Sequence, residues 1–157
     1  MKTLLIYHSK RAAVRAICEA SAMQDVDVLE LRSRYHKRPV IDVLGDCYRA
    51  VTGRGVRLAP LDIDFAQYSQ IMIVDSLTMF LPSAECNEFL YRCDLTGRDV
   101  TCIVSSRMRY FGRAGKVLRR RVSLAGGNCN GITFIVEADL AGQEETVNAF
   151  ALQQPQG

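Results

Sequence analysis

Apolar and polar positions along this chain follow two periods in turn, and the pattern predicts strands that alternate with helices. Short apolar runs with β-branched residues, bounded by polar residues, predict buried strands at 3–7, 26–31, 71–74, 100–104 and 132–136. Apolar residues at helical spacing predict helices at 12–22, 41–51, 83–91, 114–122 and 144–152, and Ser83 is the expected N-cap of the third.

This order of elements predicts an α/β fold built from βαβ units. Because such crossovers are nearly always right-handed, the five strands are expected to form a parallel sheet with helices on both faces. The run at 71–74 is continuously apolar, which is typical of a central strand covered on both sides. We expect one domain over residues 1–152 and a short C-terminal tail at 153–157.

Ligands of open parallel sheets bind outside the carboxyl ends of the strands, and this rule selects the loops at 8–14, 75–83 and 105–113. The first loop joins a strand to a helix start, where backbone N–H groups commonly hold an anion. It offers the hydroxyl of Ser9 but no glycine. His8 and Ser9 are not expected to act as a pair, because neighbouring residues of a strand point to opposite faces.

Composition narrows the class of protein further. No run approaches the roughly 18–20 apolar residues that span a bilayer, and the first apolar run is too short for a signal peptide, which predicts a cytoplasmic protein without membrane contact. The six cysteines form no Cys-x-x-Cys pair, so we interpret them as small, mostly buried hydrophobic residues in a reducing compartment.

The net charge of +3 is small, but cations are concentrated in one segment. Residues 107–121 carry seven of them and no acid: Arg107, Arg109, Arg113, Lys116, Arg119, Arg120 and Arg121. This segment is interpreted first as a solvated helix face. The alternative is a basic module that binds nucleic acid or an acidic partner.

Several segments in the predicted order resemble the flavodoxin family. The first strand and its loop read Leu4-Leu5-Ile6-Tyr7-His8-Ser9, and the segment before the third strand reads Phe65-Ala66-Gln67-Tyr68-Ser69-Gln70. The fourth strand follows Leu95-Thr96-Gly97-Arg98-Asp99. The resemblance covers almost the whole chain, and it implies a three-layer fold with the strand order 2-1-3-4-5.

The resemblance also implies FMN as cofactor and assigns site residues in the three loops. The phosphate would lie on Ser9, Lys10, Arg11, Ala12, Ala13 and Val14. The isoalloxazine ring would lie between the second and third loops, near Ser76, Phe80, Ser105, Ser106 and Arg107. If the protein is an enzyme, the resemblance implies an FMN-dependent oxidoreductase, and homodimers are common among such proteins.

The phosphate loop departs from the family pattern Ser/Thr-x-Thr-Gly-x-Thr. Ser9 keeps the first hydroxyl, but Arg11, Ala12 and Val14 replace the second hydroxyl, the glycine and the last hydroxyl. Each lost donor to a phosphate is worth about 1.5–3 kcal/mol, so two losses weaken binding by orders of magnitude. Charge from Lys10 and Arg11 would offset part of this loss.

The other two loops also differ from the family. Asp75 replaces a glycine, and a carboxylate beside a flavin would disfavour its reduced anion. Met79, Phe80 and Leu81 either pack on the sheet edge or on a partner, or supply a ring that stacks on the flavin. Arg107 and Arg109 give the third loop a basic character that suits an anion.

Three hypotheses follow for the function. In the first, the FMN site is degraded, and the protein binds an anionic small molecule or a protein partner. In the second, an Arg-assisted loop holds FMN, and the protein transfers electrons to a redox partner or reduces a substrate. In the third, residues 107–121 bind nucleic acid.

Overall fold

The sheet of the protein has five parallel strands in the order β2-β1-β3-β4-β5. The computed structural model describes residues 2–8, 25–33 and 41–140. The strands are β1 (Thr3–Tyr7), β2 (Val26–Glu30), β3 (Gln70–Ser76), β4 (Asp99–Ser106) and β5 (Asn128–Val136). The predicted fold class and strand order are therefore confirmed.

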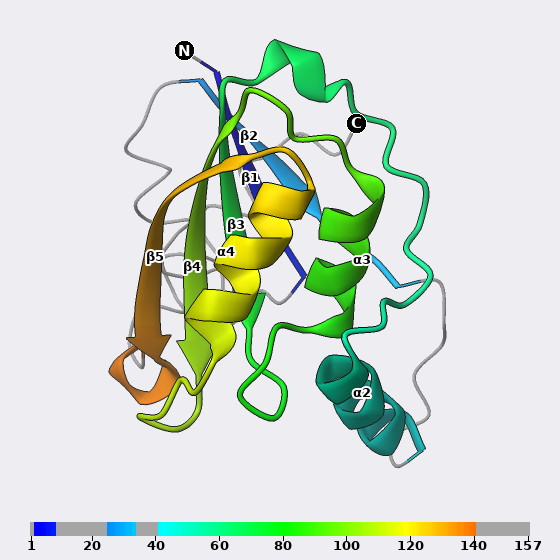
Figure 1. Ribbon diagram of the computed structural model, residues 1–157, viewed down its shortest axis with the longest axis vertical. Coiled ribbons are helices and arrows are strands. Elements are labelled where there is room, and N and C mark those ends of the chain that lie inside the picture. The colour runs from blue at the N-terminus through cyan, green and yellow to red at the C-terminus, as the bar shows by residue number, and fades with distance from the viewer. Residues whose placement is uncertain (1, 9–24, 34–40, 141–157) are drawn as a thin grey trace.

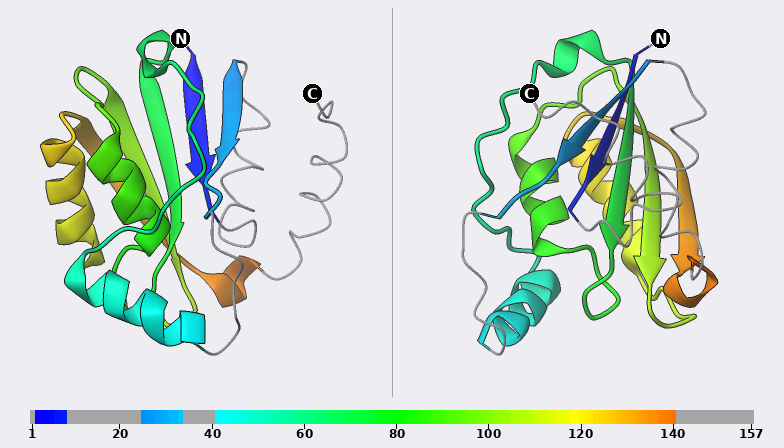
Figure 2. Two further views of the ribbon diagram at one scale, coloured as in Figure 1. Left: turned by 90° about the vertical axis from the view of Figure 1, so that its right-hand side faces the viewer. Right: turned by 180° about the vertical axis from the view of Figure 1, so that it is seen from behind.

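Helices α3 (Ala84–Arg92) and α4 (Ala114–Leu124) lie side by side against one face of the sheet (Figures 1 and 2). Helix α2 (Ile41–Thr52) lies beyond the carboxyl ends of the strands, and short 3-10 helices occupy η1 (Phe65–Gln67) and η2 (Glu137–Leu140). The helices expected at 12–22 and 144–152, and the tail at 153–157, lie outside the described residues.

The best-defined core lies between the sheet and α3 with α4. Every second residue of a strand points to this face, so Ile6 of β1 and Ile73 of β3 meet Phe89 of α3 and Leu118 of α4, and all four are at most 1% exposed. Full burial of such a side chain contributes about 1.5–3 kcal/mol. The alternation seen in the sequence thus fixes which face of each strand the helices cover.

Strands β3 and β4 extend two residues further than the apolar runs predicted. The parallel pairing continues through Asp75 with Val104 and Ser76 with Ser105. Polar side chains made these positions look like loop, but their backbones stay in the ladder because the neighbouring strand continues as well. As a consequence, Asp75, Ser76 and Ser105 occupy rigid strand ends rather than loops.

The cysteines that the structure describes are free thiols. Cys86 and Cys102 are buried, whereas Cys47, Cys93 and Cys129 are partly exposed. Within residues 2–8, 25–33 and 41–140, no group of acidic, histidine or cysteine side chains is arranged to hold a metal ion. None of the helices that the structure describes has the length and apolar character that crossing a bilayer would take.

Candidate functional site

A cavity of about 400 Å³ lies at the carboxyl ends of β3, β4 and β5. This volume is within the range of about 300–1,000 Å³ that small-molecule sites span. Its lining comes from the strand ends, the two loops that follow β3 and β4, and η2: Ser76, Leu77, Thr78, Met79, Phe80, Ser106, Arg107, Met108 and Glu137. The cavity therefore lies where the topology of the sheet predicts a ligand.

A tight hairpin after β3 forms one wall of the cavity. Thr78 and Leu81 exchange two backbone hydrogen bonds, at 2.9 and 3.0 Å, and Met79 and Phe80 form the turn between them. Their φ angles are +50° and +62°. Two positive φ angles define a type I′ turn, in which Asn and Gly are favoured. The bulky side chains of Met79 and Phe80 thus stand on a strained backbone at the rim of the cavity.

The hairpin touches the loop after β4 through an aromatic pair. The rings of Phe80 and Tyr110 meet edge to face, with centroids 5.2 Å apart and planes at 75°. Gly112 lies close by with φ +51°, and a Cβ at this position would stand 3.2 Å from the Cβ of Phe80. Edge-to-face ring pairs contribute about 0.5–1.5 kcal/mol beyond the area that they bury. This pair connects the two loops that flank the cavity.

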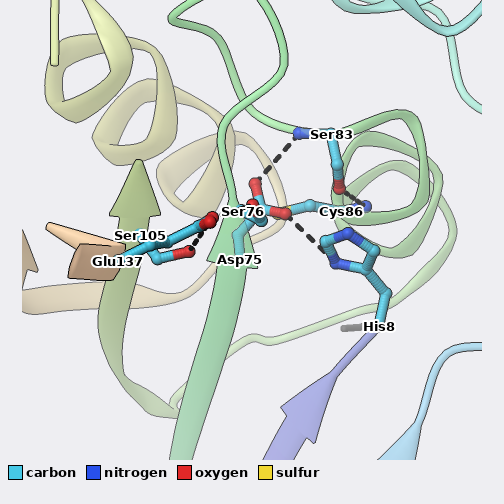
Figure 3. Close-up of polar contacts among 7 residues, drawn as sticks. All are labelled: His8, Asp75, Ser76, Ser83, Cys86, Ser105 and Glu137. Carbon is cyan, nitrogen blue, oxygen red and sulfur yellow. Dashed lines mark hydrogen bonds and ion pairs between the residues drawn. The ribbon is translucent and has the colours of Figure 1, made fainter. Parts of the chain in front are cut away.

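The floor of the cavity is polar and centres on Glu137, the first residue of η2. The hydroxyls of Ser76 and Ser105 donate to its Oε1 at 3.2 and 3.4 Å (Figure 3). Its Oε2 lies 3.6 Å from Nε of Arg107, and the side chain is 13% exposed. Sequence reasoning missed Glu137, although its place directly after a strand at the carboxyl edge of the sheet was a signal.

The cations beside this cavity face acidic partners. Arg107 lies against Glu137, and Nη2 of Arg109 lies 3.8 Å from Oδ1 of Asp139. Both arginine side chains are more than four-fifths exposed, so each pair contributes only about 0–1 kcal/mol. The described part of the site therefore carries no surplus positive charge.

On the opposite side of β3, Asp75 is 1% exposed and supports the start of α3 (Figure 3). Its Oδ2 accepts a hydrogen bond from the backbone N–H of Ser83 at 3.0 Å. The hydroxyl of Ser83 in turn accepts from the backbone N–H of Cys86 at 3.1 Å, which confirms Ser83 as the N-cap. The two side chains supply acceptors to N–H groups that a helix leaves without partners.

His8 lies at the end of β1 and faces the same carboxylate. Its Nδ1 is 3.3 Å from Oδ1 of Asp75, and the imidazole is 15% exposed. The distance suits an ion pair, but the contact lacks hydrogen-bond alignment, and Oδ1 accepts no hydrogen bond from the residues described. Oδ2 of Asp75 thus accepts a hydrogen bond at the start of α3, and Oδ1 faces the imidazole of His8.

Asp75 also affects the pKa of the buried thiol of Cys86. Burial, and next the negative charge of Asp75, raise the pKa of Cys86 well above its usual value. The thiol is therefore protonated at neutral pH and is no nucleophile. The side chain of Asp75 points to α3 and does not line the cavity, whereas the side chain of Ser76, one residue on, points to the cavity.

The structure brings part of the predicted site together. Ser76, Phe80, Ser106 and Arg107 line the cavity, and the fully buried Ser105 reaches it through its hydrogen bond to Glu137. The predicted phosphate-loop residues lie outside the described part of the chain: Ser9, Lys10, Arg11, Ala12, Ala13 and Val14.

No family model matches this chain, and no curated protein matches it. Solved structures do match it along nearly its whole length. A protein from Bacteroides uniformis, provisionally described as a flavoprotein, is 18% identical with a TM-score of 0.68, and the match covers 97% of this chain and 98% of that one.

Two further solved structures that match this chain are a flavoprotein in complex with FMN and a flavodoxin. A flavoprotein from Lactobacillus acidophilus in complex with FMN is 14% identical with a TM-score of 0.64, over 96% of this chain and 98% of that one. A flavodoxin from Streptococcus pneumoniae is 15% identical with a TM-score of 0.51, over 98% and 100%. At these identities the likeness concerns architecture alone. The protein has a flavodoxin-like fold.

Proposed function

We propose that the protein binds a flat aromatic ligand of the flavin type, held mainly by its ring system. The observation that carries this proposal is the cavity of about 400 Å³ between the hairpin and the loop after β4. Its walls are apolar, from Leu77, Met79, Phe80 and Met108, and its floor is the carboxylate of Glu137. Apolar walls with a few polar groups are what a ring with N–H and C=O edges requires.

The floor suits a ring edge that donates hydrogen bonds. Glu137 is held in place by two hydroxyl groups and accepts bonds through carboxylate oxygens, so an N–H of the ligand would find an oriented partner. Phe80 and Met79 stand above this floor on the hairpin. When bound, a flavin supplies electron- and hydride-transfer chemistry, and these residues would hold and orient its ring.

The phosphate of FMN finds less support. Arg107 and Arg109 are each paired with an acid, and the sequence of the first loop lacks two of the hydroxyls and the glycine of the family pattern. We therefore expect the ring to dominate binding, so that riboflavin and FMN bind with affinities that agree within about tenfold, or about 1.4 kcal/mol.

This expectation is tested by titrating the protein with riboflavin and with FMN and following the quenching of flavin fluorescence. The blocking variant is Met108→Trp. Its larger side chain would fill the cavity, and because Met108 is 59% exposed the change leaves the core intact. It should abolish the binding of both flavins. Strong FMN binding without riboflavin binding would instead support the Arg-assisted phosphate loop, and the absence of both would reject a flavin site.

A protein partner at the same edge is the second candidate. Met79 and Met108 line the cavity and Tyr110 packs on Phe80 beside it, with 59%, 59% and 63% of their surface exposed. Large apolar side chains gathered in this way are typical of a surface that another protein covers. A Tyr110→Asp variant, changed at a side chain that does not line the cavity, that still binds riboflavin but loses a partner captured by the wild type would support this candidate.

A further inference from the structure

A second cavity, of about 710 Å³, lies along helices α3 and α4 and is larger than the one at the strand ends. The two helices lie side by side in Figure 1. The lining of this cavity extends from the end of α2 to the turns that follow α3 and α4: Gly53, Asn87, Leu90, Tyr91, Arg92, Cys93, Asp94, Thr96, Arg121, Leu124, Ala125 and Gly126. We call it the helix groove.

The walls of the helix groove are apolar and open to solvent. Tyr91 of α3 is 88% exposed and Leu124 of α4 is 77% exposed, although each has the type of side chain that usually packs in a core or an interface. Leu90 is buried beside them. Neither Tyr91 nor Leu124 supports the core, so their apolar surface is available to a ligand.

A cation crosses the helix groove. Arg121 leaves α4 and donates a hydrogen bond from Nη1 to Oδ1 of Asn87 on α3. Asn87 is itself 4% exposed and donates to the backbone carbonyl of Arg54, so the acceptor is fixed in place. Gly53 makes room for the guanidinium, because a Cβ at this position would lie 2.8 Å from Nη2. The arginine is thus oriented by Asn87 of α3 and by the turn at 53–54 that follows α2.

Among the residues that the structure describes, no carboxylate lies within ion-pair distance of this arginine, and its printed hydrogen bond goes to Asn87; the charge of the buried Asp75 acts on it only from further away. The other charges of the groove are engaged: Arg92 lies 3.9 Å from Glu88, and the Asp94 carboxylate accepts from both the N–H and the hydroxyl of Thr96. Burial lowers the pKa of Arg121, yet a guanidinium remains charged at neutral pH.

A half-buried charge with no counter-ion in contact is unfavourable unless a ligand or another group pairs with it. Nη1 is used by Asn87, whereas Nε and Nη2 make no hydrogen bond to the described residues. A planar pair of donors of this kind matches a carboxylate, sulfonate or phosphate group. The apolar walls then select what the acid group is attached to.

We propose that the helix groove binds an amphipathic organic anion, with its acid group on Arg121 and its apolar body against Tyr91 and Leu124. This site is separate from the cavity at the strand ends and does not depend on the flavin proposal. The two sites share no lining residue, because the cavity is lined by strand ends, loops and η2, whereas the groove extends to the last turn of α3.

Two fluorescent probes with the same aromatic rings test the site. Anilinonaphthalene sulfonate carries an acid group, and N-phenylnaphthylamine is neutral; both become fluorescent on binding. We expect saturable binding of the sulfonate, weakened about tenfold or more by Arg121→Gln, since a charge-assisted bidentate contact is lost. Arg120→Gln, on the same helix but exposed, is the matched control and should change the affinity less than twofold.

The neutral probe separates charge from apolar contact. Arg121→Gln should weaken its binding less than threefold, whereas Tyr91→Ala should weaken both probes. Excess riboflavin should displace neither probe. An equal effect of Arg120→Gln and Arg121→Gln, or displacement by riboflavin, would overturn the proposal. If Arg121→Gln loses its far-UV circular dichroism signal, the Tyr91→Ala and Leu124→Ala variants replace it in the test, because both side chains are largely exposed. Sulfonate binding that is unchanged in both of these variants also overturns the proposal.

Discussion

Asp75 and Glu137 are two carboxylates at the same end of one sheet, yet they face opposite sides of it (Figure 3). Asp75 is 1% exposed and holds the start of α3 through the N–H of Ser83. Glu137 is 13% exposed, accepts from two hydroxyls and opens onto a cavity. Asp75 therefore stabilises the fold, whereas Glu137 lies where a ligand in the cavity would contact it.

The difference between them follows from the alternation of side chains along a strand. Asp75 and Ser76 are neighbours in β3, and their side chains point to opposite faces. One face is filled by α3 and α4, so a carboxylate there must be used by the helix or stay unpaired. The other face leads to the cavity, where a polar group can keep an acceptor for something that arrives from outside.

The largest expected effect is on stability. Asp75→Ala removes the acceptor for Ser83 N–H at the buried start of α3, and we expect it to lower the free energy of unfolding by about 2–4 kcal/mol. Glu137→Ala should lower it by about 1 kcal/mol or less, since its partners are hydroxyls near solvent. Urea denaturation measures both. Equal losses would remove the distinction between the two carboxylates.

For ligand binding, we expect substitution of Glu137 to have a larger effect than substitution of Asp75. Glu137→Ala is expected to lower the affinity for riboflavin about tenfold, because a ring N–H loses a charged acceptor. Asp75→Asn keeps an oxygen for Ser83 N–H and should leave the affinity within about twofold, since the side chain does not line the cavity. Fluorescence titration decides between them, and a greater loss in Asp75→Asn would place the carboxylate of Asp75 in contact with the ligand.

The smallest effect concerns alkaline pH. Because the folded protein raises the pKa of Cys86, its contribution to stability is fully present below the unfolded thiol pKa of about 8.5 and is lost as the pH rises through the folded pKa. Wild-type stability should therefore fall between about pH 9 and pH 10, and Cys86→Ala should reduce that fall by about 1 kcal/mol. Denaturation at the two pH values measures it; an unchanged fall would mean that the thiol is not desolvated.

The sequence was sufficient to predict the parallel sheet, because apolar runs and helical spacing are local signals. The N-cap Ser83 was predicted for the same reason. The roles of Asp75 and Glu137 were not predictable in this way. Whether a polar residue ends a strand depends on a neighbouring strand, and the acceptor role of Glu137 depends on Ser76, which is 61 positions earlier in the chain. Such partners are defined only once the sheet has formed.

The hairpin also gave no local signal, since it lacks the Asn and Gly that mark a type I′ turn. Met79 and Phe80 nevertheless adopt its left-handed backbone. The two backbone hydrogen bonds between Thr78 and Leu81 and the ring of Tyr110 against Phe80 support this conformation.

That left-handed backbone has a consequence for how the protein can evolve. A bulky residue in this region costs about 1–3 kcal/mol, and at the exposed Met79 a change to Asn or Gly would remove that cost with little loss of packing. Selection for stability alone would therefore replace Met79, whereas Phe80 would also lose its contact with Tyr110. Retention of Met79 among relatives would therefore indicate selection for its place at the mouth of the cavity, at the expense of stability.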